Sequence, residues 1–202
     1  MEIFDFTKNY VLGNERVLLR PLQRNDYEHL LTYALNEPDI WYYNAGGPET
    51  PERLQSYIDF TVKQREKELE YPFIVFDKKT NQYAGCTRYY DIRVDRQTIQ
   101  LGFTWYGKAF QRTGLNRHCK HLLLGLAFDR LNMLRVGLAA NIKNERSINA
   151  MKAIGCTVEG VWRSTGFDSK GERIDSILLS MLKHEWDGEW KEKLRARIAG
   201  YK

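Results

Sequence analysis

The alternation of apolar and polar positions divides the chain into a series of expected helices and strands. It predicts a strand over residues 16–22, after which Asn25 and Asp26 offer a cap for an amphipathic helix running through Leu35. A second helix should begin at Thr50-Pro51, because threonine caps helices and proline suits the first helical position. The apolar face of that helix would carry Leu54, Ile58 and Val62.

Three segments rich in aromatic and β-branched residues come next. They cover residues 72–77, 83–92 and 98–106, and their direct succession predicts an antiparallel meander. From Asn116 to Leu131 the apolar positions recur at helical spacing, and residues 135–141 then return as a strand. This part of the chain therefore predicts a strand, helix, strand unit.

The remaining pattern completes an α+β chain. A further helix is expected from Glu145 to Ile154, ended by Gly155, which can adopt the left-handed conformation found after helices. Two last strands, at 156–163 and 174–182, are joined by a turn at residues 168–171. The sum is a mixed, mostly antiparallel sheet of about six to seven strands, flanked by about four helices.

The C-terminal segment, residues 187–202, predicts a helical extension of a single domain that covers residues 1–186. An apolar stripe recurs every four residues, with lysines and arginines on the other faces. We expect this stripe to pack on the domain or on the partner in a homodimer. Contact with RNA or an anionic membrane is the alternative, which the short basic cluster disfavours. The stripe consists of Trp186, Trp190, Leu194 and Ile198.

Composition narrows the class of protein only slightly. The 202 residues suffice for a core without staples, and the three cysteines lack metal-ligand spacing, so no metal site is expected. No apolar run resembles a membrane span or a secretory signal, which predicts a cytoplasmic protein. The net charge of +5 is spread among acidic residues, and suits a phosphorylated cofactor as well as it suits RNA.

Residues 111–116 (Gln-Arg-Thr-Gly-Leu-Asn) form a turn between a predicted strand and a predicted helix. Backbone N–H groups and the helix dipole would converge there on a volume that fits a diphosphate. Gly114 would allow close backbone approach, Arg112 could add a charged contact, and Asn116 could cap the helix. A single glycine before a helix is more often an ordinary loop, so the turn alone identifies no site.

In its context, however, the turn resembles the Gln/Arg-x-x-Gly-x-Gly/Ala signature of the GNAT superfamily N-acetyltransferases, with Asn116 in the last position. A second stretch, Asn144 to Ser147 followed by residues 154–163, is similar to the Asn-x-x-Ser helix and Gly-Phe-x-x-Glu-Gly-x-x-Arg strand of Rim-type ribosomal-protein N-terminal acetyltransferases. Two motifs at this separation are more specific than either alone. The resemblance covers residues 12–186, and implies a GNAT fold splayed between strands 4 and 5, with acetyl-CoA as cosubstrate.

The resemblance also assigns roles to residues. The strand before the turn would bulge, pair with the pantetheine arm and polarise the thioester carbonyl through a backbone N–H. Asn144 would bind the pantetheine amide and Ser147 would act as an acid toward the departing sulfur, although both also suit helix capping. The implied cofactor-binding residues are Thr104, Trp105, Tyr106, Gln111, Arg112, Thr113, Gly114, Leu115, Asn116, Asn144 and Ser147. For the side chains of Trp105 and Tyr106, packing in the core is the simpler interpretation.

The implied reaction is direct attack of a neutral amine on the thioester, without an acyl-enzyme. Cys119 lies among leucines on a predicted helix face and is expected in the core. Gln100 stands where many relatives have a glutamate, and an amide cannot accept the proton. Glu159, Asp175, His118 or a water chain could substitute, but surface or cap positions explain the acids, and a solvated first-turn position explains the histidine.

The missing carboxylate favours an acceptor of low pKa. An α-amino group with a pKa of about 8 is roughly one-fifth neutral near physiological pH, against about a thousandth for a lysine amine. We therefore predict an N-acetyltransferase for an α-amine such as a protein or peptide N-terminus. A small-molecule amine, such as an amino sugar or polyamine, and a non-catalytic CoA-binding regulatory domain are the alternatives.

Candidate walls of the acceptor site are aromatic. Tyr42 and Tyr43 lie in a Trp-Tyr-Tyr-Asn-Ala-Gly-Gly-Pro loop between the first two helices, and Tyr89 lies on a predicted strand. In the GNAT enzymes that the chain resembles, the region between these helices often walls the acceptor site. Packing of these aromatic rings on the core is the equal alternative.

Overall fold

A single mixed sheet organises the computed structural model, which describes residues 2–43, 47–168 and 170–200. In this part of the chain the sheet has eight strands in the order β1-β2-β3-β4-β5-β6-β8-β7, antiparallel except for β5 and β6, which are parallel. The prediction missed only β1, whose two residues are too short for periodicity to reveal. The strands are β1 (Leu12–Gly13), β2 (Val17–Pro21), β3 (Glu70–Asp77), β4 (Gln82–Arg93), β5 (Thr98–Tyr106), β6 (Arg135–Asn141), β7 (Thr157–Phe167) and β8 (Arg173–Leu182).

The helices lie where the apolar periodicity predicted them, with short 3₁₀ and π turns added at their ends or in the connecting loops. Thr50 caps α2 as expected, because its hydroxyl accepts the N–H of Arg53 at 3.3 Å. The principal helices are α1 (Tyr27–Asn36), α2 (Pro51–Glu66), α3 (Leu115–Gly125), α4 (Glu145–Ala153), α5 (Lys183–Glu185) and α6 (Lys191–Ala199). The added turns are η1 (Arg24–Asp26), η2 (Pro38–Trp41), η3 (Lys108–Phe110), η4 (Leu126–Arg130) and η5 (Trp186–Trp190).

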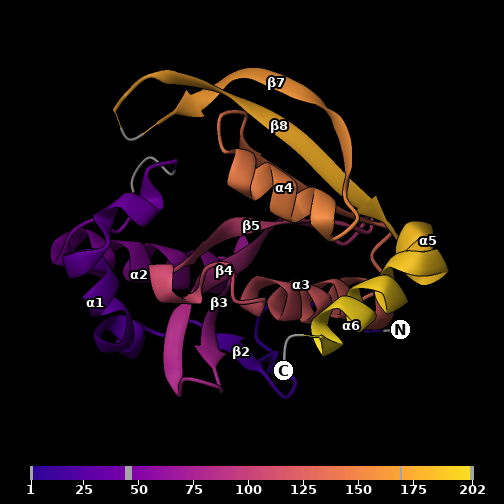
Figure 1. Cartoon of the computed structure of the whole chain (residues 1–202), viewed down its shortest axis with the longest axis horizontal. Coiled ribbons are helices and arrows are strands. Elements are labelled where there is room, and N and C mark those ends of the chain that lie inside the picture. Colours follow the sequence, from indigo (N-terminus) through magenta and orange to yellow (C-terminus); the bar gives the residue numbers. More distant parts are fainter. Residues whose placement is uncertain (1, 44–46, 169, 201–202) are drawn as a thin grey trace.

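Helices cover both faces of the sheet (Figure 1). Adjacent side chains of a strand point to opposite faces, so two neighbours on β4 identify the two layers. The guanidinium of Arg88 lies 5.7 Å from the ring of Tyr57 on α2. The hydroxyl of Tyr89 donates a hydrogen bond to the carbonyl of Leu123 in α3. The core therefore consists of two layers, one under α1 and α2 and the other under α3.

The C-terminal stripe packs on the same chain, where α6 lies alongside α3 (Figure 1). Trp186 and Leu194 are fully buried, and the indole N–H of Trp186 donates to Asp129 Oδ1 at 2.9 Å. Gly155 has a φ of +100°, and a Cβ there would lie 2.1 Å from the ring of Trp190. Glycine is thus required both to end α4 and to admit this indole. Residues 201–202 of the predicted extension lie outside the described residues.

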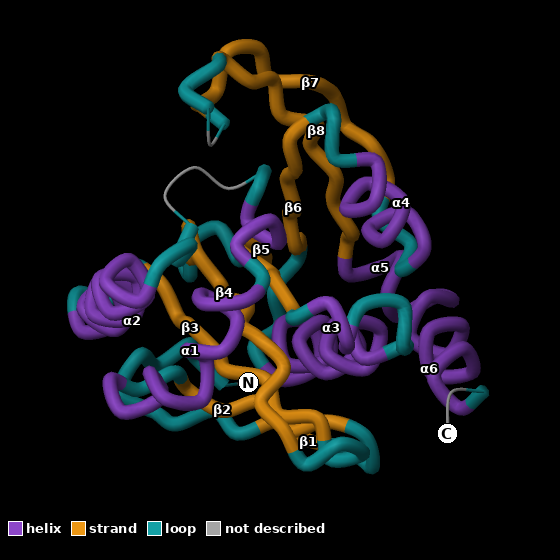
Figure 2. The backbone as a smooth tube through the Cα atoms, turned by 60° about the vertical axis from the view of Figure 1, so that its left-hand side comes forward, coloured by secondary structure: helices purple, strands orange, loops and turns teal. Residues whose placement is uncertain are grey.

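The sheet opens between β5 and β6 (Figure 2). The two strands pair only from Thr98 to Gln100, opposite Arg135 to Gly137. Beyond that point β5 contains an extra residue, because Cys86 pairs with Trp105 while Arg88 pairs with Gly102. Phe103, within this bulge, has a φ of +50°. The structure thus confirms the predicted bulge and splay, and both lie next to the 111–116 turn.

Candidate functional site

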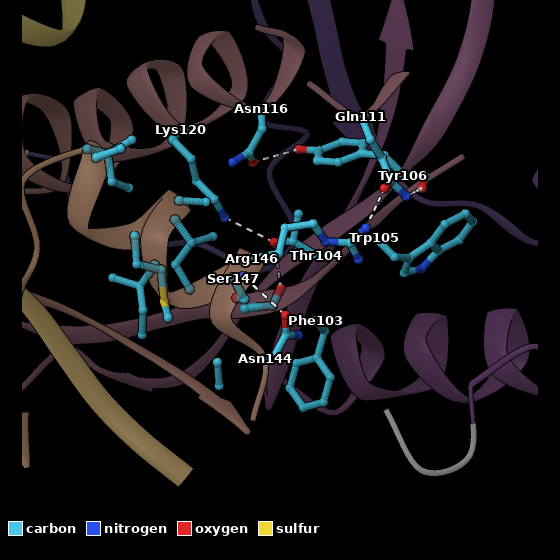
Figure 3. Close-up of a pocket in the computed structure, with 18 of the residues that line it drawn as sticks. Phe103, Thr104, Trp105, Tyr106, Gln111, Asn116, Lys120, Asn144, Arg146 and Ser147 are labelled. Atoms are coloured by element: carbon cyan, nitrogen blue, oxygen red, sulfur yellow. Dashed lines mark hydrogen bonds between the residues drawn. The ribbon is translucent and has the colours of Figure 1, made fainter. Parts of the chain in front are cut away.

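A cavity of about 340 Å³ lies where β5 and β6 separate, bounded by α3 and α4 (Figure 3). It brings together most residues of the predicted cofactor set, from the end of β5, the turn that soon follows it, and the start of α4. Thr113 and Leu115 are not among its lining residues, because Thr113 bonds the Phe110 carbonyl and Leu115 is fully buried. The predicted residues that line the cavity are Thr104, Trp105, Tyr106, Gln111, Arg112, Gly114, Asn116, Asn144 and Ser147.

The 111–116 turn exposes the first turn of α3 to the cavity. Arg112 has a φ of +63° and Gly114 a φ of +86°, so the chain reverses tightly before α3 begins at Leu115. The first N–H groups of a helix have no acceptors within it and carry the positive end of the helix dipole. Gly114 and Asn116 both line the cavity. An anion can therefore be bound at this end of α3.

The prediction that Asn116 caps α3 is wrong. The left-handed Gly114 occupies the capping position, so Asn116 is already the second residue of the helix. Its Oδ1 instead accepts a hydrogen bond from the Tyr106 hydroxyl at 3.3 Å. This contact links α3 to the end of β5.

Positive charge dominates the cavity wall. Arg146 of α4 donates to Gln111 Oε1, and Gln111 Nε2 donates to the Tyr106 carbonyl at 2.9 Å, so the turn is fixed to its neighbours on both sides. Among the described lining residues there is no aspartate or glutamate. Such a wall favours a polyanionic ligand. The cationic side chains that line it are Arg112, Arg117, Lys120 and Arg146.

Residues at the start of α4 both cap this helix and line the cavity. Asn144 is the capping residue, and its Oδ1 accepts the N–H of Ser147 at 3.1 Å. Both side chains also line the cavity, on the wall formed by α4 (Figure 3). Helix capping thus fixes the position of two residues that face a ligand site.

The aromatic residues at the end of β5 belong mainly to the core, as expected for their side chains. Trp105 is 5% exposed and donates its indole N–H to the Tyr57 hydroxyl at 3.3 Å. Its ring also meets that of Trp41 edge-on at 5.1 Å. Burial raises the pKa of Tyr106 well above its usual value, so this phenol stays neutral and can donate to Asn116.

Lys120 is a lining residue that the sequence interpretation missed. It projects from α3 and donates from Nζ to Thr104 Oγ1 at 3.0 Å (Figure 3). Burial lowers its pKa from 10.5 to about 8. The available signal was helical spacing, because Lys120 lies one turn beyond Asn116 and one turn before the buried Leu123.

The structure places the three predicted acceptor-site residues in different environments. Tyr43 lines the cavity, and its hydroxyl donates to the Lys143 carbonyl at 3.1 Å. Tyr42 is 43% exposed and is not a lining residue; Lys170 Nζ lies 5.6 Å from its ring. Tyr89 is fully buried beneath α3, so the prediction that it walls an acceptor site is wrong. Residues 44–46 of the predicted aromatic loop lie outside the described residues.

Gln100 stands at the last paired position before the splay, opposite Gly137 of β6. A Cβ on Gly137 would lie 2.4 Å from Gln100 Oε1, so the absence of a side chain there leaves room for the amide. On the same face of β5, Gly102 lies under the ring of Tyr90. An amide rather than a carboxylate therefore stands beside the opening of the sheet.

The other candidate bases are engaged outside the cavity. Glu159 pairs with Arg135 at 2.5 Å, and this hydrogen bond lowers the pKa of the carboxyl group. Asp175 Oδ1 accepts the N–H of Ser164 at 2.7 Å. His118 is 1% exposed, so the expectation of a solvated residue is wrong; it lies 3.0 Å from Asn14 Nδ2, and burial lowers its pKa.

The three cysteines of the chain do not line the cavity. The three cysteines are free and buried, and burial raises the pKa of Cys119 to about 12, as suits a core thiol. Within residues 2–43, 47–168 and 170–200, no three His, Cys, Asp or Glu side chains gather as metal ligands. No helix in the same ranges is long and apolar enough to cross a membrane.

Comparison with known proteins gives one consistent result. Residues 16–157 match the acetyltransferase (GNAT) domain. YdaF of Bacillus subtilis (strain 168), named as a proposed ribosomal N-acetyltransferase, is 25% identical over 181 residues, which cover 87% of this chain and 96% of YdaF. Spermidine N(1)-acetyltransferase of Escherichia coli (strain K12) is 24% identical over 177 residues, 87% of this chain and 90% of that protein.

A solved structure shows the same fold. The GCN5-related N-acetyltransferase from Brucella melitensis superposes with a TM-score of 0.86, at 21% identity, over 95% of this chain and 86% of that chain.

Proposed function

Because the chain belongs to the acetyltransferase (GNAT) domain family and is thus an acetyl-CoA-dependent N-acetyltransferase, we propose that the cavity between β5, α3 and α4 binds acetyl-CoA, and that the acceptor is an α-amine. One observation carries the first part. Cationic side chains and the start of α3 converge on a cavity whose described lining has no acidic residue. Coenzyme A carries several phosphate charges, which this wall complements.

Each segment of the wall suits a different part of the cosubstrate. The start of α3, with Gly114 and Arg112, would bind the pyrophosphate. The unpaired edge of β5 beyond Gln100 would hydrogen-bond the pantetheine arm as an added strand. Ser147, on the opposite wall, would lie near the sulfur. A backbone N–H of the bulge would then polarise the thioester carbonyl.

The reaction is a direct transfer within a ternary complex. The neutral acceptor amine attacks the thioester carbonyl carbon, a C–N bond forms, and the C–S bond breaks. The leaving sulfur receives a hydrogen bond or proton from the Ser147 hydroxyl, the amine releases its extra proton to water, and water returns any proton that the hydroxyl has lost. Buried thiols of high pKa such as Cys119 take no part, because only a thiolate is an effective nucleophile.

The chemistry near Gln100 supports an acceptor of low pKa. Gln100 itself cannot take a proton, and Glu159 and Asp175 are held in other contacts. The rate should then depend on the fraction of acceptor that is already neutral. At neutral pH a substantial fraction of α-amino groups is unprotonated, whereas almost all lysine side chains are protonated.

The test uses matched peptides of one sequence. One has a free N-terminus and no lysine, the second has a blocked N-terminus and one internal lysine, and spermidine is a third acceptor. Release of CoA thiol is measured across pH. We expect the free N-terminus to react faster, with kcat/KM rising until the pH passes the acceptor amine pKa. Faster reaction of the lysine peptide or of spermidine at pH 7 would contradict the proposed acceptor class.

A further inference from the structure

Lys120 is a nucleophile inside the cavity that the proposed reaction does not use. Its side chain extends from α3 toward β5 and ends at Thr104, the residue after the bulge position Phe103 (Figure 3). The residue as a whole is only 5% exposed. Thr104 Oγ1 is also hydrogen-bonded to Thr87 Oγ1 on β4 at 2.7 Å. This second contact fixes the hydroxyl to which the Lys120 amine donates.

Among the described residues the amine has no ionic partner to hold its charge. In the described part of the chain no carboxylate lies within 4.0 Å of Nζ, and the titratable groups that act on it are the thiols of Cys119 and Cys156. Burial without a counter-ion favours the neutral amine. With a pKa of about 8, roughly a quarter of the Lys120 side chains are neutral at pH 7.5, against about one in a thousand for an ordinary lysine.

The Lys120 amine lies beside the bulge of β5, where the thioester of acetyl-CoA is expected. If acetyl-CoA binds as proposed above, its thioester lies beside Phe103 and Thr104, where β5 leaves β6. Lys120 Nζ lies 3.0 Å from Thr104 Oγ1 on that same wall. A neutral amine held beside an acyl donor gains a high effective concentration. This step rests on the proposed function.

We propose that Lys120 is a self-acetylation site of this enzyme, modified by acetyl-CoA bound in its own cavity. Nζ attacks the thioester carbonyl carbon, a C–N bond forms and the C–S bond breaks. The sulfur leaves as CoA thiol with the proton that the amine loses. The product is an amide, which cannot be protonated at neutral pH and no longer places an unpaired cation in the cavity wall.

Two consequences follow from the geometry. The added acetyl group occupies space in a cavity of about 340 Å³ beside the thioester position, so the modified enzyme should bind acetyl-CoA more weakly. Loss of the buried charge should also stabilise the folded chain against unfolding. Self-acetylation would therefore weaken acetyl-CoA binding and raise the stability of the folded chain.

The experiment incubates the full chain with isotopically labelled acetyl-CoA and no acceptor, followed by intact mass and peptide mapping. We expect one labelled acetyl group at Lys120 in the molecules whose Lys120 amine is free at the start. Labelling at Lys120 should proceed at least ten-fold faster than at exposed Lys143, which lies before α4 and whose carbonyl accepts a hydrogen bond from the lining residue Tyr43. Lys120→Arg should abolish this acetylation and Lys143→Arg should leave it unchanged. Acetylation spread evenly over surface lysines, or none at Lys120, would overturn the proposal.

Acetyl-CoA titration by calorimetry separates this proposal from the proposed function. If the wild-type chain binds acetyl-CoA and acetylates an acceptor while Lys120 stays unmodified, only the self-acetylation is refuted. If acetyl-CoA does not bind, the cofactor assignment itself fails. Mapping of the wild-type chain decides the matter even if the Lys120→Arg variant does not fold.

Discussion

The two sides of the opening between β5 and β6 are built in different ways. The cosubstrate side consists of helix starts and a free strand edge, whose binding groups are backbone N–H and C=O groups supported by capping residues such as Asn144. The side that must remove a proton depends on individual side chains, and Gln100 stands there against Gly137. Anion binding thus needs mainly local backbone geometry, while proton removal needs one particular residue that this chain lacks at that position.

The largest expected effect concerns Lys120, on the cosubstrate side. Its pKa is lowered from 10.5 to about 8, so the unfolded chain binds more protons between these values and the wild type gains stability as pH rises through them. Relative to wild-type chain whose Lys120 is unmodified by intact mass, Lys120→Met should therefore raise the free energy of unfolding by about 3 kcal/mol below pH 8, with the gain vanishing toward pH 10.5. Urea unfolding at pH 7 and pH 10 measures it.

Exposed Lys152→Met on α4 is the control for that comparison and should change stability little at either pH. A Lys120→Met variant that is less stable than the wild type at pH 7, or equally stabilised at both pH values, would contradict the account of an uncompensated buried amine.

The next largest effect concerns Ser147. If its hydroxyl assists the departing sulfur, Ser147→Ala should lower kcat about 100-fold while the Kd for acetyl-CoA changes less than two-fold. The cap of α4 survives, because Asn144 Oδ1 accepts the backbone N–H of residue 147 and not its hydroxyl. Steady-state kinetics and calorimetry on the variant measure the two quantities. Ser56→Ala, at an exposed position of α2, is the matched control. An unchanged kcat would remove Ser147 from the reaction.

A smaller effect is expected on the acceptor side. Gln100→Glu keeps the shape of the side chain and supplies the missing proton acceptor. We expect kcat/KM for a lysine peptide to rise about ten-fold at pH 7, with a smaller gain for an α-amine that is already partly neutral. The ratio of the two rates is the measurement. Equal gains for both acceptors would show that proton removal does not separate the two classes.

The sequence predicted local backbone features of this molecule better than the positions of individual side chains. The strands from Glu70 to Tyr106 and the start of α2 at Thr50 lie where local residue types placed them, because strand and capping preferences act over a few residues. The cap of α3 was misplaced by two residues, since the left-handed Gly114 starts the helix before Asn116. The left-handed conformation of Gly114 depends on the backbone of the whole 111–116 turn, and not on one residue type.

Errors about side chains came from packing between distant elements. The sequence placed Tyr89 on a strand, yet strand alternation alone could not show that its ring lies under α3, away from the cavity. Lys120 was missed because its burial results from α3 lying on Thr104 of β5. His118 was taken as solvated for the same reason, because its burial depends on Asn14 near the first strand.

The claim that acetyl-CoA binds at the start of α3 is tested most directly by calorimetric titration of acetyl-CoA into three proteins. These are the wild type, Arg112→Ala in the turn, and Arg163→Ala at an exposed position of β7. A charge-assisted hydrogen bond contributes about 1.5 kcal/mol or more, so Arg112→Ala should raise the Kd about ten-fold while Arg163→Ala matches the wild type. Equal affinity of all three proteins would contradict the assignment of the phosphate site.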